Sequence, residues 1–404
     1  MAKREDKYKP RKDGRFSTNF RTGRYHDDGS PEIIPVYAES SRELEEKIAE
    51  LKFLRKSGNL IVPSNIMFSA YCKKWLATKK KRGINTYAMY ENAVLKHIIP
   101  SLGNIMAKNI SRTHCQQLID ARFEHYETCN KLKLTMKQIQ KALIYDKIIT
   151  EEFWINIEMP KKPATEKRPL TDLEKKAVRL ADFTMDEKTF VYLLFGCGLR
   201  REEAIALNCS AIDLKQRLIH VRQVIVFDKH KPVLESRAKS SDGIRSVPIP
   251  IDFFPTIQFY VLSLMKHTAD KPEDTFLFTT KGGLLTKSSY DKLWQRIVRK
   301  MNWAVLDNDI KNKILQDKED NYRLSIYKEM ESRCKDALPI QGLTAHIFRH
   351  NYATLLYYSG ISELKAVELM GHSDSKMIRE VYAHLDEKKE NTVVKLDSNI
   401  SLIS

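Results

Sequence analysis

The sequence predicts a multidomain protein with a small α+β domain first, an all-α domain second and a mixed α/β domain last. Three observations support this fold class. Residues 1–38 are short, turn-rich and basic, residues 64–162 carry apolar side chains at helical spacing, and the region after residue 170 alternates helical with strand-like patterns. Boundaries are expected at 1–58, 64–162 and 170–390, with a C-terminal tail at 391–404.

The first domain is predicted to be a small sheet of about three strands packed by one helix. Asp13-Gly14 is a tight-turn signal between two short extended segments. Ser40 and Glu43 form a capping box ahead of Leu44, which predicts the start of the helix. Gly58 and Pro63 then mark the end of the domain.

The second domain is predicted to be helical and basic. Residues 64–162 contain 17 Lys+Arg against 8 Asp+Glu. The run at 79–82 (KKKR) is typical of a solvated helix end, and it also suits an edge that contacts phosphates. A segment rich in proline and charge, 160–169, separates this domain from the next.

The third domain is predicted to mix helices with strands. Thr171 and Glu174 open its first helix with a capping box. Segments 217–226 and 245–251 have β-branched strand patterns, whereas 190–195 and 344–358 indicate helices. The charged segment 306–339 is interpreted as an insertion or an extended connection.

The composition favours some classes of function for this chain and argues against others. The 404 residues include 69 Lys+Arg and 52 Asp+Glu, a formal net charge of +17, which favours a polyanionic partner such as nucleic acid. No apolar run approaches the roughly 20 residues that span a bilayer, so a membrane protein is not expected. The six cysteines form no CxxC pair or zinc-ligand cluster, which predicts reduced thiols in the cytoplasm and no metal or other cofactor.

Three features of the last domain carry candidate chemistry. Residues 196–203 (GCGLRREE) place Arg200 at the start of a helix, where an anion meets a guanidinium and free N–H groups. His346 and Arg349 share one helix face at i and i+3. Gly371-His372 is followed ten residues later by Tyr382. Taken singly, each is more often structural: an arginine paired with Glu203, a helix-face pair, or a core tyrosine.

In this order the motifs resemble the tyrosine recombinase (phage integrase) family, of the conjugative-transposon and temperate-phage integrase type. The matching stretches are GCGLRREEAIAL, AHIFRHNYATLLYYSG and ELMGHSDSKMIREVYAHL. The resemblance implies that 170–390 is the catalytic domain, that 64–162 is a helical core-binding (SAM-like) domain, and that 1–58 is an arm-binding domain.

The resemblance also implies roles for six residues. Tyr382 matches the nucleophile, Arg200 and Arg349 the arginines that hold the scissile phosphate, and His346 the general base. His372 matches a hydrogen-bond donor to a phosphate oxygen. Lys239 matches the proton donor for the leaving oxygen. It begins a Lys…Arg-x-Val-Pro motif, which is expected to lie on a β-hairpin. Lys215, Lys229 and Lys231 are alternatives to Lys239. His350 and His384 are interpreted as structural, and Tyr352, Tyr357 and Tyr358 as core residues.

The expected function is therefore site-specific integration and excision of a mobile element through a 3′-phosphotyrosyl intermediate. The implied partners are double-stranded attachment sites of core and arm type and a homotetramer formed on DNA, with a possible excision factor or host DNA-bending protein. The tail 391–404 is expected to contact a neighbouring protomer. Two alternatives remain open: a chromosomal dimer-resolving recombinase and a catalytically inactive architectural DNA-binding protein.

Overall fold

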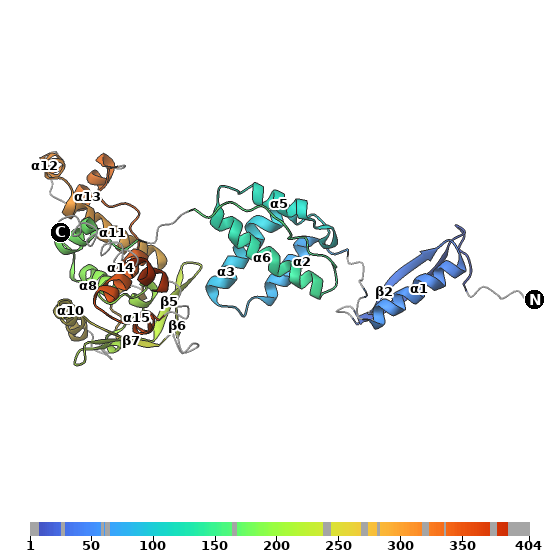
Figure 1. Cartoon of the computed structure of the whole chain (residues 1–404), viewed down its shortest axis with the longest axis horizontal. Coiled ribbons are helices and arrows are strands. Elements are labelled where there is room, and N and C mark those ends of the chain that lie inside the picture. The colour runs from blue at the N-terminus through green and yellow to red at the C-terminus, as the bar shows by residue number, and fades with distance from the viewer. Residues whose placement is uncertain are drawn as a thin grey trace, which may run out of the picture. The chain divides into compact units, whose positions relative to one another are not determined.

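The computed structural model describes most of the chain and divides it into two compact units, Met1–Ala164 and Thr165–Ser404 (Figure 1). The residues described are 8–25, 29–57, 60, 65–163, 168–236, 244–267, 274–280, 283–316, 323–334, 337–371 and 378–386. Among these residues, no helix is long and apolar enough to cross a membrane.

The N-terminal module of the first unit is a two-stranded antiparallel sheet with one helix packed on it. The strands are β1 (Phe16–Tyr25) and β2 (Pro31–Ala38), and the helix is α1 (Ser41–Lys56). Apolar side chains from all three elements, among them Phe20, Val36 and Leu44, form its core. The Ser40 hydroxyl accepts the Glu43 N–H, as the capping box predicts.

The expectation of about three strands is wrong for the residues described here. Residues before β1 form a tight turn in which the Arg11 N–H donates to the Arg15 carbonyl at 2.8 Å. Pro10 precedes that turn and has no N–H with which to extend the ladder. The Asp13-Gly14 signal therefore marks a turn, without a third paired strand in 8–15.

The second part of the first unit is all-helical, as predicted. Its helices are α2 (Phe68–Thr78), α3 (Ile84–Ala93), α4 (Ile99–Leu102), α5 (Arg112–Asp120) and α6 (Tyr126–Tyr145), with a π-helical turn at Val94–Ile98 and a 3₁₀ turn at Ala107–Asn109. The π turn connects α3 to α4 just before Pro100, whose missing N–H and bulky ring disfavour a regular helical turn. Large buried side chains such as Phe68, Leu132 and Met136 form its core.

The second unit is built around three α-helices and a small sheet. α8 (Met185–Phe195) packs against α10 (Phe254–His267) and α14 (Ala345–Tyr358), and α7 (Asp172–Leu180) packs against α11 (Lys287–Val305). The predicted capping box of Thr171 and Glu174 is present at the start of α7. The remaining helices are α9 (Arg201–Ala204), α12 (Asn308–Gln316), α13 (Arg323–Arg333), α15 (Glu363–Met370) and 378–386.

The strands of this unit form separate small sheets. β3 (Ile212–Asp213), β4 (Leu218–Val221) and β7 (Arg245–Pro248) make one antiparallel sheet, β5 (Gln223–Asp228) and β6 (Lys231–Ser236) make a hairpin, and β8 (Thr279–Thr280) pairs with β9 (Gly283–Leu284). The single strand expected at 217–226 is thus two strands, which meet at Arg222 and enter different sheets. The strand expected at 245–251 ends at Pro248.

The described residues of the charged segment 306–339 form helices with a core of their own. Leu306, Ile314, Ile326, Met330 and Cys334 are buried together where α12 and α13 pack. Arg299 on α11 pairs with Glu331 on α13 at 2.7 Å. The segment is therefore a small helical subdomain, whereas the sequence left open an extended connection.

Candidate active site

The Gly-Leu-Arg motif places Arg200 where α9 begins. Arg200 is the N-cap residue of α9, and its N–H donates to the Glu203 carboxylate at 2.8 Å. Gly198 precedes it with φ +61°, and a Cβ there would lie 2.0 Å from the Tyr352 ring. Only glycine fits both the backbone angle and the space, so this residue sets the path of the chain into Arg200.

The His-x-x-Arg motif lies on α14 and meets Arg200 at one pocket. His346, Arg349 and Arg200 line this pocket of about 380 Å³, together with Arg201, Glu202, Tyr290, Asp291, Trp294, Thr344 and Ala345. Arg201 lies over the Tyr290 ring at 5.3 Å and pairs with Glu202. Tertiary structure thus brings together three of the six predicted site residues, from segments about 150 residues apart in the chain.

Both predicted arginines are held by carbonyl oxygens at the end of α15. Arg200 donates through Nη2 to the Gly371 carbonyl at 3.0 Å. Arg349, which is fully buried, donates through Nη1 to the Gly198 carbonyl at 2.6 Å and through Nη2 to the Met370 carbonyl. Gly371 ends α15 in the left-handed conformation, which turns successive carbonyls toward the guanidinium groups.

Glu203 is the buried carboxylate that these arginines share. It accepts a hydrogen bond from Arg200 Nη1 at 2.8 Å. It also accepts from Arg245 Nη1 at 3.1 Å and Nη2 at 2.7 Å. Burial alone would raise the pKa of the Glu203 carboxyl, but the hydrogen bonds from Arg245 and the charges of Arg245, Arg349 and Arg200 hold that pKa well below its usual range.

Arg245 is the site residue that the sequence reasoning missed. The Arg-x-Val-Pro motif contains it, but the motif was used only to locate the lysine before it. Its partners, Glu203 and Leu369, are distant in sequence, so only their juxtaposition in the fold shows what the arginine contacts.

Tyr382 is not among the residues that line the arginine pocket. Its side chain is 8% exposed in a small core with Tyr352, Leu356 and Met370. Its hydroxyl donates to the Ile361 carbonyl at 3.0 Å. Burial, and then the charge of Glu363, raises the pKa of Tyr382, so the phenol is protonated at neutral pH in this arrangement.

Lys239 and His372 lie outside the described residues. Lys239 falls between β6, which pairs with β5, and β7, which pairs with β4. The expected β-hairpin at Lys239 stays a prediction. Lys229 and Lys231 lie instead at the turn of the β5–β6 hairpin, and neither they nor Lys215 line the arginine pocket.

The neighbouring histidine and tyrosine candidates differ in their burial. His350 is buried and its ring meets that of His346 edge-on at 4.7 Å. Tyr352 packs under Gly198, but Tyr358 is 72% exposed, so its assignment to the core is wrong. In the part of the chain that the structure describes, no group of three or more acidic, histidine or cysteine side chains is arranged to hold a metal ion.

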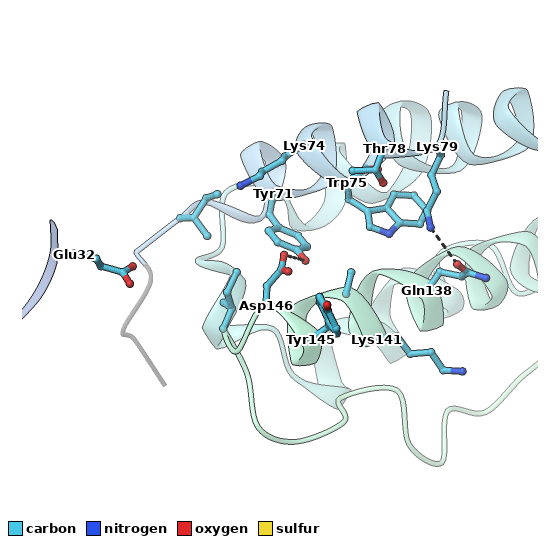
Figure 2. Close-up of a pocket in the computed structure, with 13 residues that line it drawn as sticks. Glu32, Tyr71, Lys74, Trp75, Thr78, Lys79, Gln138, Lys141, Tyr145 and Asp146 are labelled. Atoms are coloured by element: carbon cyan, nitrogen blue, oxygen red, sulfur yellow. Dashed lines mark hydrogen bonds between the residues drawn. The ribbon is translucent and has the colours of Figure 1, made fainter. Parts of the chain in front are cut away.

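The helical part of the first unit has a second candidate surface, a groove between α2 and α6. Figure 2 shows Lys74 and Lys79 projecting from α2 and Lys141 and Tyr145 from α6. The Lys79 ammonium lies 4.9 Å from the Trp75 ring, and Tyr145 is 86% exposed. Two acidic side chains also line this pocket: Asp146, which accepts a hydrogen bond from Tyr71 at 2.8 Å, and Glu32 of β2.

Comparison with known families matches both units. The phage integrase family matches residues 170–389, and the N-terminal SAM-like domain of phage integrases matches residues 67–121. The predicted fold class, with its helical core-binding and mixed α/β catalytic domains, is thereby confirmed.

Three curated relatives are similar in sequence. The integrase of Staphylococcus phage L54a is 22% identical over 86% of this chain and 96% of its own length, and the ICEBs1 integrase of Bacillus subtilis (strain 168) is 23% identical over 91% and 89%. A XerC-like tyrosine recombinase of Caldanaerobacter subterraneus subsp. tengcongensis is 26% identical over 58% of this chain, and the match spans only 54% of that relative.

Two solved structures share the fold. The Tn1549 transposon integrase, in complex with a circular intermediate DNA, is 17% identical and superimposes with a TM-score of 0.61 over 80% of this chain and 99% of that one. A lambda integrase dimer bound to a COC′ core site is 14% identical, with a TM-score of 0.53 over 95% and 96%.

The Glu203 cluster predicts a pH-dependent contribution to stability. Replacing Glu203 by Gln should lower the free energy of unfolding at pH 7 by about 3 kcal/mol, because buried guanidinium groups lose their counter-charge. The folded-state pKa lies below the ordinary 4.5, so the contribution is complete above that pH and is lost as the pH falls through the folded value. The difference between wild type and variant should therefore be constant above about pH 5 and shrink toward pH 3.

This difference is measured on the full chain by titration with urea. Hydrogen exchange of the α15 amides reports the unfolding of this part of the chain. Glu202→Gln is the matched control, because that carboxylate is one-third exposed in its pair with Arg201 and should contribute less than about 1 kcal/mol. Equal losses in the two variants, or a difference that does not vary with pH, would contradict the prediction.

Proposed function

The chain belongs to the phage integrase family of site-specific DNA recombinases of mobile elements, and we propose that it integrates and excises its element through a 3′-phosphotyrosyl intermediate. The observation that carries this proposal is the convergence of Arg200, His346 and Arg349 on one pocket. Two guanidinium groups beside an imidazole suit a phosphodiester whose negative charge grows during attack.

In the proposed reaction, the Tyr382 oxygen attacks the scissile phosphorus and the 5′-oxygen leaves. Arg200 and Arg349 stabilise the non-bridging oxygens, and His346 takes the tyrosine proton. Lys239 protonates the leaving oxygen and His372 donates to a phosphate oxygen. The covalent bond to tyrosine conserves the energy of the broken ester, so a 5′-hydroxyl of another strand can reverse the step.

The position of Tyr382 adds a conformational step to this proposal. Its hydroxyl is bonded to the Ile361 carbonyl and does not line the arginine pocket. Attack therefore requires the hydroxyl to exchange this carbonyl for the phosphate. The buried phenol also needs a base, since burial raises its pKa.

Replacing Tyr382 by Phe should abolish covalent attachment to DNA while leaving site binding within about twofold, because only the nucleophilic oxygen is removed. A nicked suicide substrate of the crossover site, resolved on a denaturing gel, traps the adduct. Tyr357→Phe is the matched control, since its ring contacts that of Tyr382 and it has a hydroxyl of its own. Adduct in the Tyr382 variant would assign the nucleophile elsewhere, and its absence from the wild type would reject the proposed function.

The lysines of the α2–α6 groove support binding of the core-type site by the helical domain. Lys74, Lys79 and Lys141 supply positive charge along the groove, and exposed Tyr145 offers an aromatic face. Cations beside aromatic rings are the usual means of tracking a nucleic-acid backbone. The two DNA-bound structures that share this fold agree with a DNA partner for this part of the chain.

The double substitution Lys74→Ala with Lys141→Ala should weaken binding to a core half-site duplex. The slope of log K against log salt should become shallower by roughly 1 per lysine removed. Titrations at several KCl concentrations measure it. Lys73→Ala serves as the control, because that lysine is exposed on α2 but does not line the groove. A slope unchanged by the double substitution would remove the groove from the interface.

The outer face of the N-terminal sheet supports binding of arm-type sites. Asn19 and Arg21 on β1 stand opposite Pro35 and Ile33 on β2, and all four are exposed. The Arg11 and Arg15 guanidinium groups lie over the neighbouring Tyr37 ring at 5.6 and 6.0 Å. A two-stranded ribbon with such side chains is narrow enough for the major groove of B-DNA.

Arg21→Ala combined with Tyr37→Ala should reduce binding to arm-type fragments by at least about tenfold, since a phosphate or base contact and the surface that orients two arginines are both lost. Cleavage of a core half-site should not change. Arg42→Ala is the control, because that side chain is 90% exposed on α1, away from the sheet. Equal binding of every attachment-site fragment by the variant and the wild type would remove the arm-binding proposal.

The proposed organisation assigns 1–58 to arm sites, 64–162 to the core site and 170–390 to catalysis, in a homotetramer on DNA. The tail 391–404, proposed to contact a neighbour, lies outside the described residues. An excision factor or host bending protein remains part of the proposal. A cytoplasmic location is also proposed, because all six cysteines are free buried thiols. The match over most of this chain to phage and ICEBs1 integrases favours this reading over a chromosomal dimer-resolving recombinase.

A further inference from the structure

Arg245 is a buried arginine that stands beside the arginine pocket without lining it. It is the first residue of β7, and its side chain is 3% exposed. A buried guanidinium is costly to desolvate, so its partners need to satisfy both its charge and its hydrogen bonds.

All three nitrogens of the Arg245 guanidinium are in use. Nη1 and Nη2 donate to the two oxygens of Glu203 at 3.1 and 2.7 Å, and Nε donates to the Leu369 carbonyl at 2.7 Å. The backbone of Gly371 packs closely against this guanidinium. A Cβ on Gly371 would lie only 2.7 Å from Arg245 Nη1. All three nitrogens are occupied and Arg245 does not line the arginine pocket, so it acts on that pocket through these partners.

Those partners hold the two arginines of the pocket. Glu203 accepts from the backbone and the guanidinium of Arg200, and the carbonyls that follow Leu369 accept from Arg349 and Arg200. Three consecutive carbonyls at the end of α15, those of Leu369, Met370 and Gly371, thus each receive one arginine. Arg245 on β7 therefore links α9, through Glu203, to α15, through Leu369, and both helices contact the arginines that line the pocket.

The charge of Arg245 has a further consequence for Arg200. Glu203 is fully buried and ionised, and it attracts whichever guanidinium groups lie nearest. Arg245 contacts both of its oxygens and so satisfies much of that attraction. Without Arg245, the carboxylate would compete with the scissile phosphate for Arg200.

We propose that Arg245 is a positioning residue for DNA cleavage, which neutralises Glu203 and fixes the end of α15 so that Arg200 and Arg349 are presented to the phosphate. This inference rests on the proposed function. It predicts that losing Arg245 impairs the stabilisation of phosphate charge in particular, and that binding of DNA by the other domains is retained.

The test compares two suicide substrates, one with a normal scissile phosphate and one with a methylphosphonate at that position. The methylphosphonate is uncharged, so its cleavage depends much less on guanidinium groups. Arg245→Gln should cleave the normal substrate about 100-fold more slowly than wild type, as expected for misplaced catalytic groups. On the methylphosphonate that deficit should shrink at least about tenfold, as it should for Arg200→Ala.

Lys300→Met is the matched control. Lys300 is also a buried cation of this unit, paired with Glu187 at 2.5 Å, but it does not line the arginine pocket. Any deficit from loss of stability alone should be equal on the two substrates. If Arg245→Gln does not fold, Arg245→Lys keeps the charge beside Glu203 but not the paired hydrogen bonds, and it should show the same dependence on substrate with a smaller deficit.

The outcomes separate the inference from the proposed function. A wild type that forms no Tyr382-dependent adduct on the normal substrate would reject the proposed function. A wild type that cleaves, together with Arg245 variants that lose equal activity on both substrates or none on either, would overturn the positioning role. A substrate-dependent deficit in a variant that still binds the half-site would support it.

Discussion

The site depends on one buried carboxylate. Glu203 lies where the charges of Arg200, Arg245 and Arg349 would otherwise repel one another in a medium that screens them poorly. Its ionised form allows three guanidinium groups to gather within one small volume. Two of these arginines, Arg200 and Arg349, can then line the same pocket, which is the preorganisation that the proposed phosphate chemistry requires.

The end of α15 provides the second half of this arrangement. A helix C-terminus has unpaired carbonyls and the negative end of the helix dipole, so it attracts cations. Here Leu369, Met370 and Gly371 offer three successive carbonyls, one to each arginine. Two glycines make the geometry possible: Gly371 ends the helix beside Arg245, and Gly198 lets the chain pass Tyr352 on its way to Arg200. A side chain at either position would displace part of the cluster.

The sequence predicted those elements of the fold that depend on interactions between residues close together in the chain. The N-cap at Ser40 and the capping box at Thr171 formed because they satisfy N–H groups within a few residues, and the helix at 344–358 followed its own apolar period. Prediction failed for strands, whose limits depend on the strand with which they pair. The third N-terminal strand and the continuous strand at 217–226 each required knowledge of which strand lies alongside. Tyr358 was misplaced because an apolar ring on a helix does not reveal which face is covered.

By itself, the sequence determined that the chain is a basic, multidomain member of its family, because the order of Gly-Leu-Arg, His-x-x-Arg and the later tyrosine can be seen without a fold. It also determined that Arg200 begins a helix and that His346 and Arg349 share one, since both follow from spacing. Only the tertiary structure decided that Arg245 contacts Glu203 and that the Tyr382 hydroxyl rests on the Ile361 carbonyl. These contacts join segments 21 to 42 residues apart, and their energy depends on burial and on the direction of carbonyl groups, which no local pattern specifies.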